Sequence, residues 1–357
     1  MLKTIPLLLT LAAAAAAQDA PTVAFQFAVS GDSRNCGDIV MPAIAANVLS
    51  TPARFYWHLG DFRAIYTFDE DLVPPPATGL KPAPLTISGY ESMAWPDFIR
   101  RQLTPFGALP VYLAIGNHEA IPPMSRDLYI AQFADWINSD VIRTQRLNDL
   151  PTDHLVKTYY HWIQQGVDFI TLDNATSDKF DDAQLTWLRG VLQRAVASPQ
   201  VRTIVVGMHA ALPGSTGASH SMNNWAQGDK SGRDVYQQLW NAQQASGKKV
   251  YLLASHSHFL LEDVYNTPDW QGRVLPGWIV GTAGAVRYRL PNHLPSGIQA
   301  RTDVYGFLLA SVLTDGTLTF QFHEVKLDDL RQADHGTHPD AVIKWCAEHN
   351  QSLLPPS

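Results

Sequence analysis

The chain has 357 residues, of which 46% are hydrophobic, so it is long and apolar enough for one large domain or two small ones. Its 26 Lys and Arg residues against 33 Asp and Glu residues leave a net charge of -7. An acidic surface repels phosphate backbones, and we therefore expect no general nucleic-acid binding.

The first residues have the pattern of an export signal. Lys3 is followed by the apolar run IPLLLTLAAAAAA and then by Gln18. This predicts a signal peptide over residues 1–17, cleaved near Ala17, and hence a secreted or periplasmic protein. A buried N-terminal helix or a membrane anchor is the alternative, but the run is shorter than the roughly 20 residues that span a bilayer. We expect no membrane span elsewhere.

Five apolar runs of strand length each end in polar, ionisable residues. They are VAFQFAVSGD at 23–32, RFYWHLGD at 54–61, LPVYLAIGNHE at 109–119, VRTIVVGMHA at 201–210 and KVYLLASHSHF at 249–259. Runs that are apolar throughout are typical of strands buried on both faces of a sheet.

Helical patterns lie between these runs, at 41–49, 181–197 and 233–244. The alternation of strands and helices predicts a layered α/β fold. Near the C-terminus, two apolar runs flank Asp315-Gly316 and predict a β-hairpin. With no repeat and no linker in the sequence, we expect one domain over residues 22–330 and a helical extension, 331–357, that packs on it.

Two features leave alternatives open. The proline-rich stretch 68–95 predicts a long loop, which is either a substrate-facing lid or an inert insertion. Cys36 and Cys346 can form a disulfide in an exported chain, or they can remain free thiols.

The residues that follow the five strands share one chemistry. Ligands of open α/β sheets bind beyond the carboxyl ends of the strands. The side chains expected there are oxygen and imidazole donors of the kind that divalent metals take: Asp32, Asp61, Asn117, His118, Glu119, His209, His256 and His258. Because alternate residues of a strand point the same way, we expect His256 and His258 to face one site.

These motifs resemble those of the calcineurin-like metallophosphoesterases, the superfamily that includes purple acid phosphatases. The resemblance covers roughly residues 23–325 and rests on five blocks in order: Gly31-Asp32, Gly60-Asp61, Gly116-Asn117-His118-Glu119, His209 and His256-Ser257-His258. It implies a four-layer sandwich of two mixed β-sheets flanked by helices, with two divalent metal ions (Mn, Fe, Zn or Mg).

The resemblance also implies a role for each ligand. Asp61 would bridge the two ions, Asn117, His209 and His256 would complete one site, and Asp32 and His258 would belong to the other. Two cations about 4 Å apart can clamp a phosphoryl group and acidify a water molecule, which supplies hydroxide for attack. The substrate would be a small phosphorylated molecule.

His118 is not needed as a ligand in this scheme. Imidazole titrates in a useful range, so we expect His118 to act as general acid for the leaving group, with Glu119 as its orienter. A purely structural role for His118 is the alternative.

Arg34 departs from the family pattern. The family usually places His two residues after the first Asp, where this chain has Arg34. Some members instead place Tyr three residues after the second Asp, where this chain has Ala64. Guanidinium has no lone pair and cannot bind a metal. We expect Arg34 either to bind a substrate phosphate or to brace Asp32.

The resemblance therefore implies an exported, metal-dependent phosphoesterase that cleaves a phosphomonoester or a small phosphodiester. The alternative is a catalytically impaired protein of the same fold that only binds a metal and a phosphorylated ligand. Arg34 motivates that alternative and His118 opposes it. A nuclease is a third reading, disfavoured by the acidic charge. Trp57, Trp95 and Trp225 are candidates for an apolar wall beside the leaving group, although core packing explains Trp57 equally well.

Overall fold

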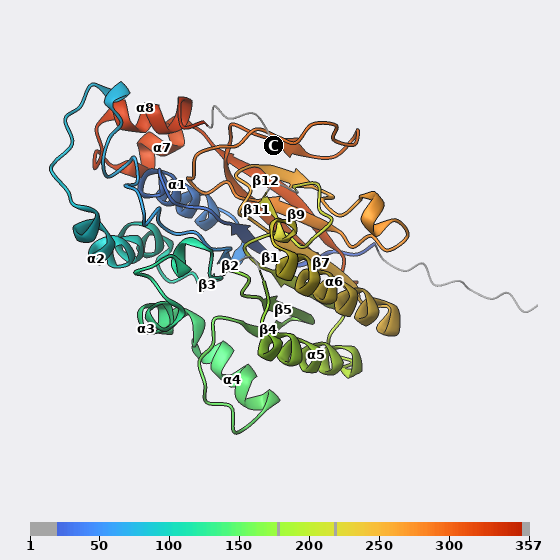
Figure 1. Ribbon diagram of the computed structural model, residues 1–357. Helices are drawn as coiled ribbons and strands as arrows, with labels where there is room; N and C mark the ends of the chain where they lie inside the picture. The colour runs from blue at the N-terminus through green and yellow to red at the C-terminus, as the bar shows by residue number, and fades with distance from the viewer. Residues whose placement is uncertain (1–19, 177–178, 218–219, 352–357) are drawn as a thin grey trace, which may run out of the picture.

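Two mixed β-sheets pack face to face in the computed structural model, and helices cover their outer faces (Figure 1). The structure describes residues 20–176, 179–217 and 220–351. The expected signal peptide and the last six residues of the expected C-terminal extension lie outside these ranges. The predicted α/β sandwich of two mixed sheets flanked by helices is confirmed.

The first sheet has five strands in the order β12-β11-β1-β2-β3. β1, β2 and β3 run parallel, whereas β11 is antiparallel to both β1 and β12. The bounds are β1 Val23–Ser30, β2 Ala53–His58, β3 Val111–Leu113, β11 Tyr305–Leu313 and β12 Leu318–Val325. β11 and β12 form the hairpin expected around Asp315-Gly316.

The second sheet has seven strands in the order β10-β8-β9-β7-β6-β5-β4. Its central strands β5, β6, β7 and β9 are parallel, and the outer ones pair antiparallel. The bounds are β4 Tyr160–Gln164, β5 Val167–Thr171, β6 Thr203–Gly207, β7 Lys249–Ala254, β8 Leu260–Glu262, β9 Gly277–Val280 and β10 Ala300–Arg301.

An aromatic core joins the two sheets. Phe27 on β1 stacks on Phe55 on β2 with ring centroids 5.1 Å apart, and both meet Phe169 of the second sheet edge-on. The opposite face of β1 is also buried: Ala28 packs in the cluster that contains α1. Strands covered on both sides need apolar residues at every position, which explains the continuous runs in the sequence.

Helices form the outer layers. Their bounds are α1 Gly37–Leu49, α2 Ile87–Phe98, α3 Arg126–Ile137, α4 Asp140–Asp149, α5 Asp182–Ala197, α6 Ala226–Ser246, α7 Leu327–Asp334 and α8 Asp340–Glu348. α5 and α6 pack on the second sheet, whereas α1, α7 and α8 pack on the first. α5 begins where expected, because the Asp181 side chain accepts a hydrogen bond from the Gln184 N–H. No helix of the described ranges has the length and hydropathy that a bilayer crossing requires.

The C-terminal helices are joined to the first sheet. α7 packs against α1, and a disulfide between Cys36 and Cys346 links α8 to the residue that precedes α1. The Arg287 side chain donates to the Asn350 carbonyl close by. Of the two alternatives for the cysteines, the disulfide is the one that forms.

The long loop expected over residues 68–95 is shorter in the structure, because α2 begins at Ile87. The Thr86 side chain caps α2 by accepting from the Gly89 N–H. Gly89 and Pro96 obscure the helical pattern in the sequence. At the start of the loop, Asp69 and Asp71 accept hydrogen bonds from the backbone N–H groups of Asn35 and Asp38, so this segment supports the turn between β1 and α1.

Candidate metal centre

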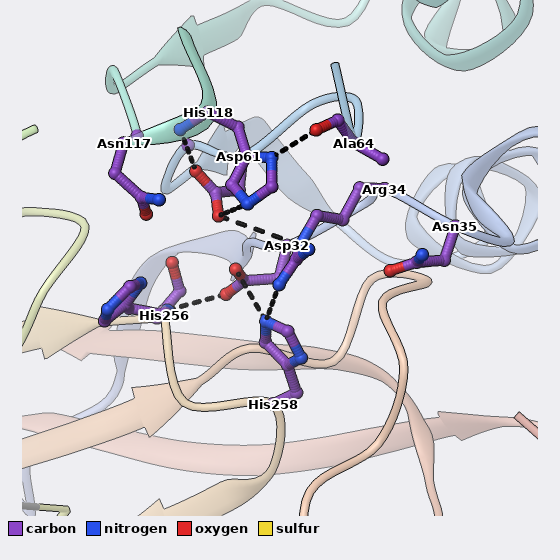
Figure 2. Close-up of polar contacts among 12 residues, drawn as sticks. Asp32, Arg34, Asn35, Asp61, Ala64, Asn117, His118, His256 and His258 are labelled. Carbon is purple, nitrogen blue, oxygen red and sulfur yellow. Dashed lines mark hydrogen bonds and ion pairs between the residues drawn. The ribbon is translucent and has the colours of Figure 1, made fainter. Parts of the chain in front are cut away.

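Side chains that follow five parallel strands from both sheets converge, as the strand-end pattern predicts. Figure 2 shows Asp32, Asp61, Asn117 and His256 among them. Each side chain comes from the turn that follows one strand: Asp32 after β1, Asp61 after β2, Asn117 after β3, His209 after β6 and His256 after β7. Three of these residues have left-handed backbones, with φ of 61° at Asp32, 60° at Asp61 and 65° at His256. Residues other than Gly adopt this conformation rarely, and such residues gather at functional sites.

Four donors form what we call the Asp61 cluster: Asp61, Asn117, His209 and His256. The Nε2 atom of His209 lies 2.9 Å from Asn117 Oδ1, 3.2 Å from Asp61 Oδ1 and 2.9 Å from His256 Nδ1. Donor atoms of Asp61, His209 and His256 all lie within 4.8 Å of one another. Atoms this close, all with lone pairs to share, are arranged as metal ligands are.

The orientation of His209 suits metal binding. Its Nδ1 lies 2.9 Å from the Leu59 carbonyl, which can only accept, so Nδ1 carries the proton and Nε2 faces the Asp61 cluster. Burial opposes a positive charge here, but Asp61 raises the pKa of His209 to about 10. Without a metal ion, the imidazolium therefore balances the Asp61 carboxylate, and a bound cation would replace that proton.

Asp32 and His258 form the second half of the site. The Asp32 Oδ2 accepts from the His256 N–H at 2.6 Å, and Oδ1 lies 3.3 Å from His258 Nε2. The His258 Nδ1 donates to the Val286 carbonyl at 2.6 Å, which leaves Nε2 as the atom that faces the centre. Burial alone would raise the pKa of Asp32, but His258 lowers it to about 2.

Arg34 lies between the two halves (Figure 2). Its Nη2 atom is 3.2 Å from His258 Nε2, and its Nε atom is 3.8 Å from Asp61 Oδ2. Only 11% of the side chain is exposed. Burial lowers the pKa of Arg34, but Asp61 and other neighbours raise it above its ordinary value. The ion pair is thus with Asp61, and not with Asp32 as one sequence-based alternative held.

His118 lies at the edge of the site. Its Nδ1 donates to the Ala64 carbonyl at 2.7 Å, and its Nε2 is 3.7 Å from Asp61 Oδ2. The ring packs against the exposed Tyr66, with centroids 5.2 Å apart. Burial lowers the pKa of His118 to about 4, although Asp61 opposes the shift. Nε2 therefore faces the site as the atom that can carry a second proton.

The expected role of Glu119 as orienter of His118 needs correction. The Glu119 carboxylate accepts hydrogen bonds from the backbone N–H groups of Asp61, Phe62 and Gly116, at 2.8, 2.8 and 2.9 Å. It fixes the turn that carries Asp61, whereas the Ala64 carbonyl orients the His118 ring. Three backbone N–H groups already occupy the buried carboxylate, and the imidazole bonds the Ala64 carbonyl instead.

His256 and His258 both reach the centre, but not as alternate residues of an extended strand, as the sequence predicts. β7 ends at Ala254, and His256 is in a left-handed turn instead of an extended strand. The Asp32 carboxylate holds this turn through the His256 N–H.

β9 and the loop that follows it also shape the centre, and the sequence patterns did not predict them. β9 is followed by Gly281, where a Cβ atom would stand 2.7 Å from Asp32 Oδ2. The same loop supplies Tyr288, whose ring stacks on His258 with centroids 4.0 Å apart. The run GWIV at 277–280 was a signal of the strand, but no ionisable residue follows it directly.

A groove beside the Asp61 cluster has both polar and apolar walls. Its lining includes the polar Asn117 and His256 and the apolar Ile121, Pro122 and Trp225. Trp225 is 56% exposed. Of the three tryptophans considered for an apolar wall, Trp225 lines this groove, whereas Trp57 and Trp95 are buried in a hydrophobic core cluster.

The residues fit a divalent metal ion. Asp32 Oδ1 and Asp61 Oδ2 are buried and find no hydrogen-bond partner among the residues that the structure describes. Buried carboxylate oxygens are rarely left this way unless a cation, a water molecule or a guanidinium satisfies them, and the Arg34 Nε atom lies 3.8 Å from the Asp61 oxygen. The mixed oxygen and imidazole donors suit a first-row metal or Mg²⁺.

The sequence also matches a known protein family. Residues 45–259 match the family model described as calcineurin-like phosphoesterase. That range contains Asp61, His118, His209 and His258, but not Asp32 or Arg34. No curated protein matches the chain.

Solved structures resemble the fold at low sequence identity. Purple acid phosphatase PPD1 from yellow lupin (Lupinus luteus) seeds is 14% identical, with a TM-score of 0.52, over 93% of this chain and 56% of that one. The chain thus spans little more than half of the lupin protein. PhoD is also 14% identical, with a TM-score of 0.50, over 86% of this chain and 70% of that one. These likenesses concern the fold alone.

Proposed function

We propose that this chain, which belongs to the calcineurin-like phosphoesterase family, hydrolyses a phosphomonoester or a small phosphodiester with the help of a divalent metal ion. The observation that supports this most directly is the Asp61 cluster, where buried and half-buried oxygen and nitrogen donors from four strand ends point at one another. The mixed donor set suits Mn, Fe, Zn or Mg. A second ion, implied by the family resemblance, would need Asp32 and His258 as ligands.

A divalent cation in the Asp61 cluster would stabilise negative charge on a phosphoryl group and make a nearby water molecule more acidic. The chain's own residues would supply the ligands for the cation and further positive charge. Asp61 and His209 would be two of the ligands that hold the cation, and the Arg34 guanidinium adds a fixed positive charge with planar N–H donors that suit phosphoryl oxygens.

His118 is the proposed proton donor to the leaving group. Its Nδ1 is held by the Ala64 carbonyl, so Nε2 is directed toward the centre from the side opposite His258 (Figure 2). A phosphoryl group bound nearby is negative and would raise the pKa of the ring, which favours the protonated form. A protein that only binds its ligand has no need of a proton donor at this point.

We also propose that the protein is exported. The disulfide between Cys36 and Cys346 supports an oxidising compartment, since such bonds are rare in the cytosol. The expected signal peptide at 1–17 remains a prediction.

The activity test uses purified full-length protein, stripped by chelation and reloaded with Mn²⁺, Zn²⁺, Fe²⁺ or Mg²⁺. Hydrolysis of p-nitrophenyl phosphate or of bis-p-nitrophenyl phosphate with at least one metal is expected. Asp61→Asn should abolish it, whereas Asp140→Asn, an exposed change on α4, should not. Tight phosphate binding without turnover under any metal would favour the binding protein, and cleavage of DNA or RNA in preference to both small esters would favour a nuclease.

A further inference from the structure

Arg34 occupies the place where the family resemblance puts the second metal ion. That ion would need the free oxygen of Asp61, a carboxylate oxygen of Asp32 and the Nε2 atom of His258. The guanidinium contacts two of these three ligands, with Nη2 3.2 Å from His258 Nε2 and Nε 3.8 Å from Asp61 Oδ2.

The lone pair on His258 Nε2 already accepts a hydrogen bond from Arg34. Because Nδ1 of His258 donates to the Val286 carbonyl, Nε2 of the neutral ring can only accept. Arg34 Nη2 is always protonated and donates to it. A metal ion could take this lone pair only if it displaced the guanidinium.

The turn that carries Arg34 is held firmly on both sides, which opposes displacement of the guanidinium by a metal ion. On one side, the N–H groups of Asp32 and Ser33 donate to the carbonyls of Gly60 and Asp61. On the other, the Asn35 N–H donates to Asp69, and Cys36 is bonded to Cys346. The backbone that carries Arg34 is therefore fixed, and only 11% of the side chain is exposed, so the guanidinium has little freedom to move into solvent.

The Asp61 cluster differs from this half of the site. Three of its donor atoms, from Asp61, Asn117 and His256, lie within 3.2 Å of the fourth, His209 Nε2. Asp61 therefore presents Oδ1 to a metal position and Oδ2 to Arg34. One carboxylate links a metal site to a guanidinium.

We propose that the Arg34 guanidinium replaces the second metal ion, so that this chain binds one divalent cation per molecule, at the Asp61 cluster. The inference rests on the proposed function for its metal site. A phosphoryl group in the centre would then lie between a metal ion and a permanently charged, planar donor. Such a site needs one ion for full occupancy.

The test is metal stoichiometry, which does not depend on activity. The stripped full-length protein is dialysed to equilibrium against Mn²⁺ and, separately, Zn²⁺, and bound metal per chain is measured by elemental analysis. The wild-type protein should bind one ion tightly. Its Mn²⁺ form should give the electron paramagnetic resonance spectrum of an isolated ion, without the signal of an exchange-coupled pair.

The decisive variant is Arg34→His, which places a ligand where the family pattern has one. It should bind two ions and, with Mn²⁺, give the signal of a coupled pair. Arg233→His, whose arginine pairs with Asp229 and Asp269 on the surface, is the matched control and should still bind one. Two tightly bound ions in the wild-type protein would overturn the inference but leave the proposed phosphoesterase intact. Absence of any bound ion would overturn both.

Discussion

The Glu119 carboxylate holds Asp61 in place by accepting a hydrogen bond from its backbone N–H at 2.8 Å, with Phe62 and Gly116 donating to the same group. Asp61 has a left-handed backbone, so its turn needs such support. Glu119 therefore acts on the centre through Asp61 and is a positioning residue.

Glu119→Gln should weaken metal binding by roughly 10–100-fold, the usual effect of losing a partner behind a metal ligand. Glutamine replaces one accepting oxygen with an NH₂ group, which would face a backbone N–H and lose that hydrogen bond. Titration of the stripped protein with Zn²⁺ measures the effect. Glu348→Gln, at an exposed position on α8, is the control. Equal affinities in the two variants would contradict the positioning role.

The disulfide should stabilise the fold and the turn that carries Arg34. Cys36 and Cys346 are separated by 310 residues in the sequence, so the bond restricts the unfolded chain over a long loop. Removing it in the Cys36→Ser, Cys346→Ser double variant should lower the free energy of unfolding by about 2–5 kcal/mol. Urea unfolding followed by circular dichroism measures this.

The same double variant should also loosen the turn between β1 and α1. Amide hydrogen exchange of residues 33–38 should become faster than in the wild-type protein, while exchange in α5 stays the same. An unchanged unfolding midpoint together with unchanged exchange would show that hydrogen bonds alone hold α8 in place.

Much of this centre could be predicted from strand ends. Continuous apolar runs followed by Asp, Asn or His locate the carboxyl ends of β1, β2, β3, β6 and β7, because strands buried on both faces leave little other pattern. The apolar runs do not predict the direction in which the side chain of a turn residue points. The left-handed backbones of Asp32, Asp61 and His256 depend on contacts with other strands, such as the hydrogen bond from His256 to Asp32.

The contacts of Arg34 could not be predicted from the sequence, for the same reason. Its position was conspicuous, but its contacts depend on the turn from Asp32 to Asn35, on His258 and on the loop after β9. Tyr288 and Gly281 in that loop carry no charge that would mark them. Helix α2 was missed because Gly89 and Pro96 within it are residues that usually end helices.

A buried ion cluster far from the centre predicts a pH effect on stability. On β4, His161 has its ring nitrogens 2.8 Å from Asp168 and 2.5 Å from Asp149. Burial opposes its charge, but the two carboxylates raise the pKa of His161 from 6.5 to about 9. The charged ring therefore stabilises the folded chain fully below about pH 6.5, and this contribution disappears as the pH rises through about 9.

His161→Asn should accordingly be less stable than the wild-type protein by about 3 kcal/mol near pH 6, with the difference falling toward zero near pH 10. Urea unfolding at a series of pH values measures it. His293→Gln, at an exposed position, is the control and should show no such trend. A difference that stays constant from pH 6 to pH 10 would mean that packing, and not charge, explains the effect.

Trp225 should favour aromatic leaving groups. It lines the groove beside Asn117 and His256 and is 56% exposed, so its ring is free to stack on a substrate. Aromatic pairs are worth about 0.5–1.5 kcal/mol, so Trp225→Ala should raise KM for an aryl phosphate roughly 2–10-fold. KM for an alkyl phosphate should change less. Equal changes for both substrates would indicate that Trp225 supports the groove without selecting the leaving group.

The contribution of His118 to kcat should increase as the leaving group becomes poorer. A general acid contributes about 10²–10⁴-fold when the departing oxygen needs a proton, and much less when that oxygen is already stable as an anion. His118→Gln should therefore reduce kcat strongly for an alkyl phosphate and only slightly for p-nitrophenyl phosphate. Metal stoichiometry should not change, because the His118 side chain donates to the Ala64 carbonyl and is not one of the donors of the Asp61 cluster. A uniform loss of kcat across leaving groups would instead assign His118 to holding the turn, since a structural defect slows every substrate alike.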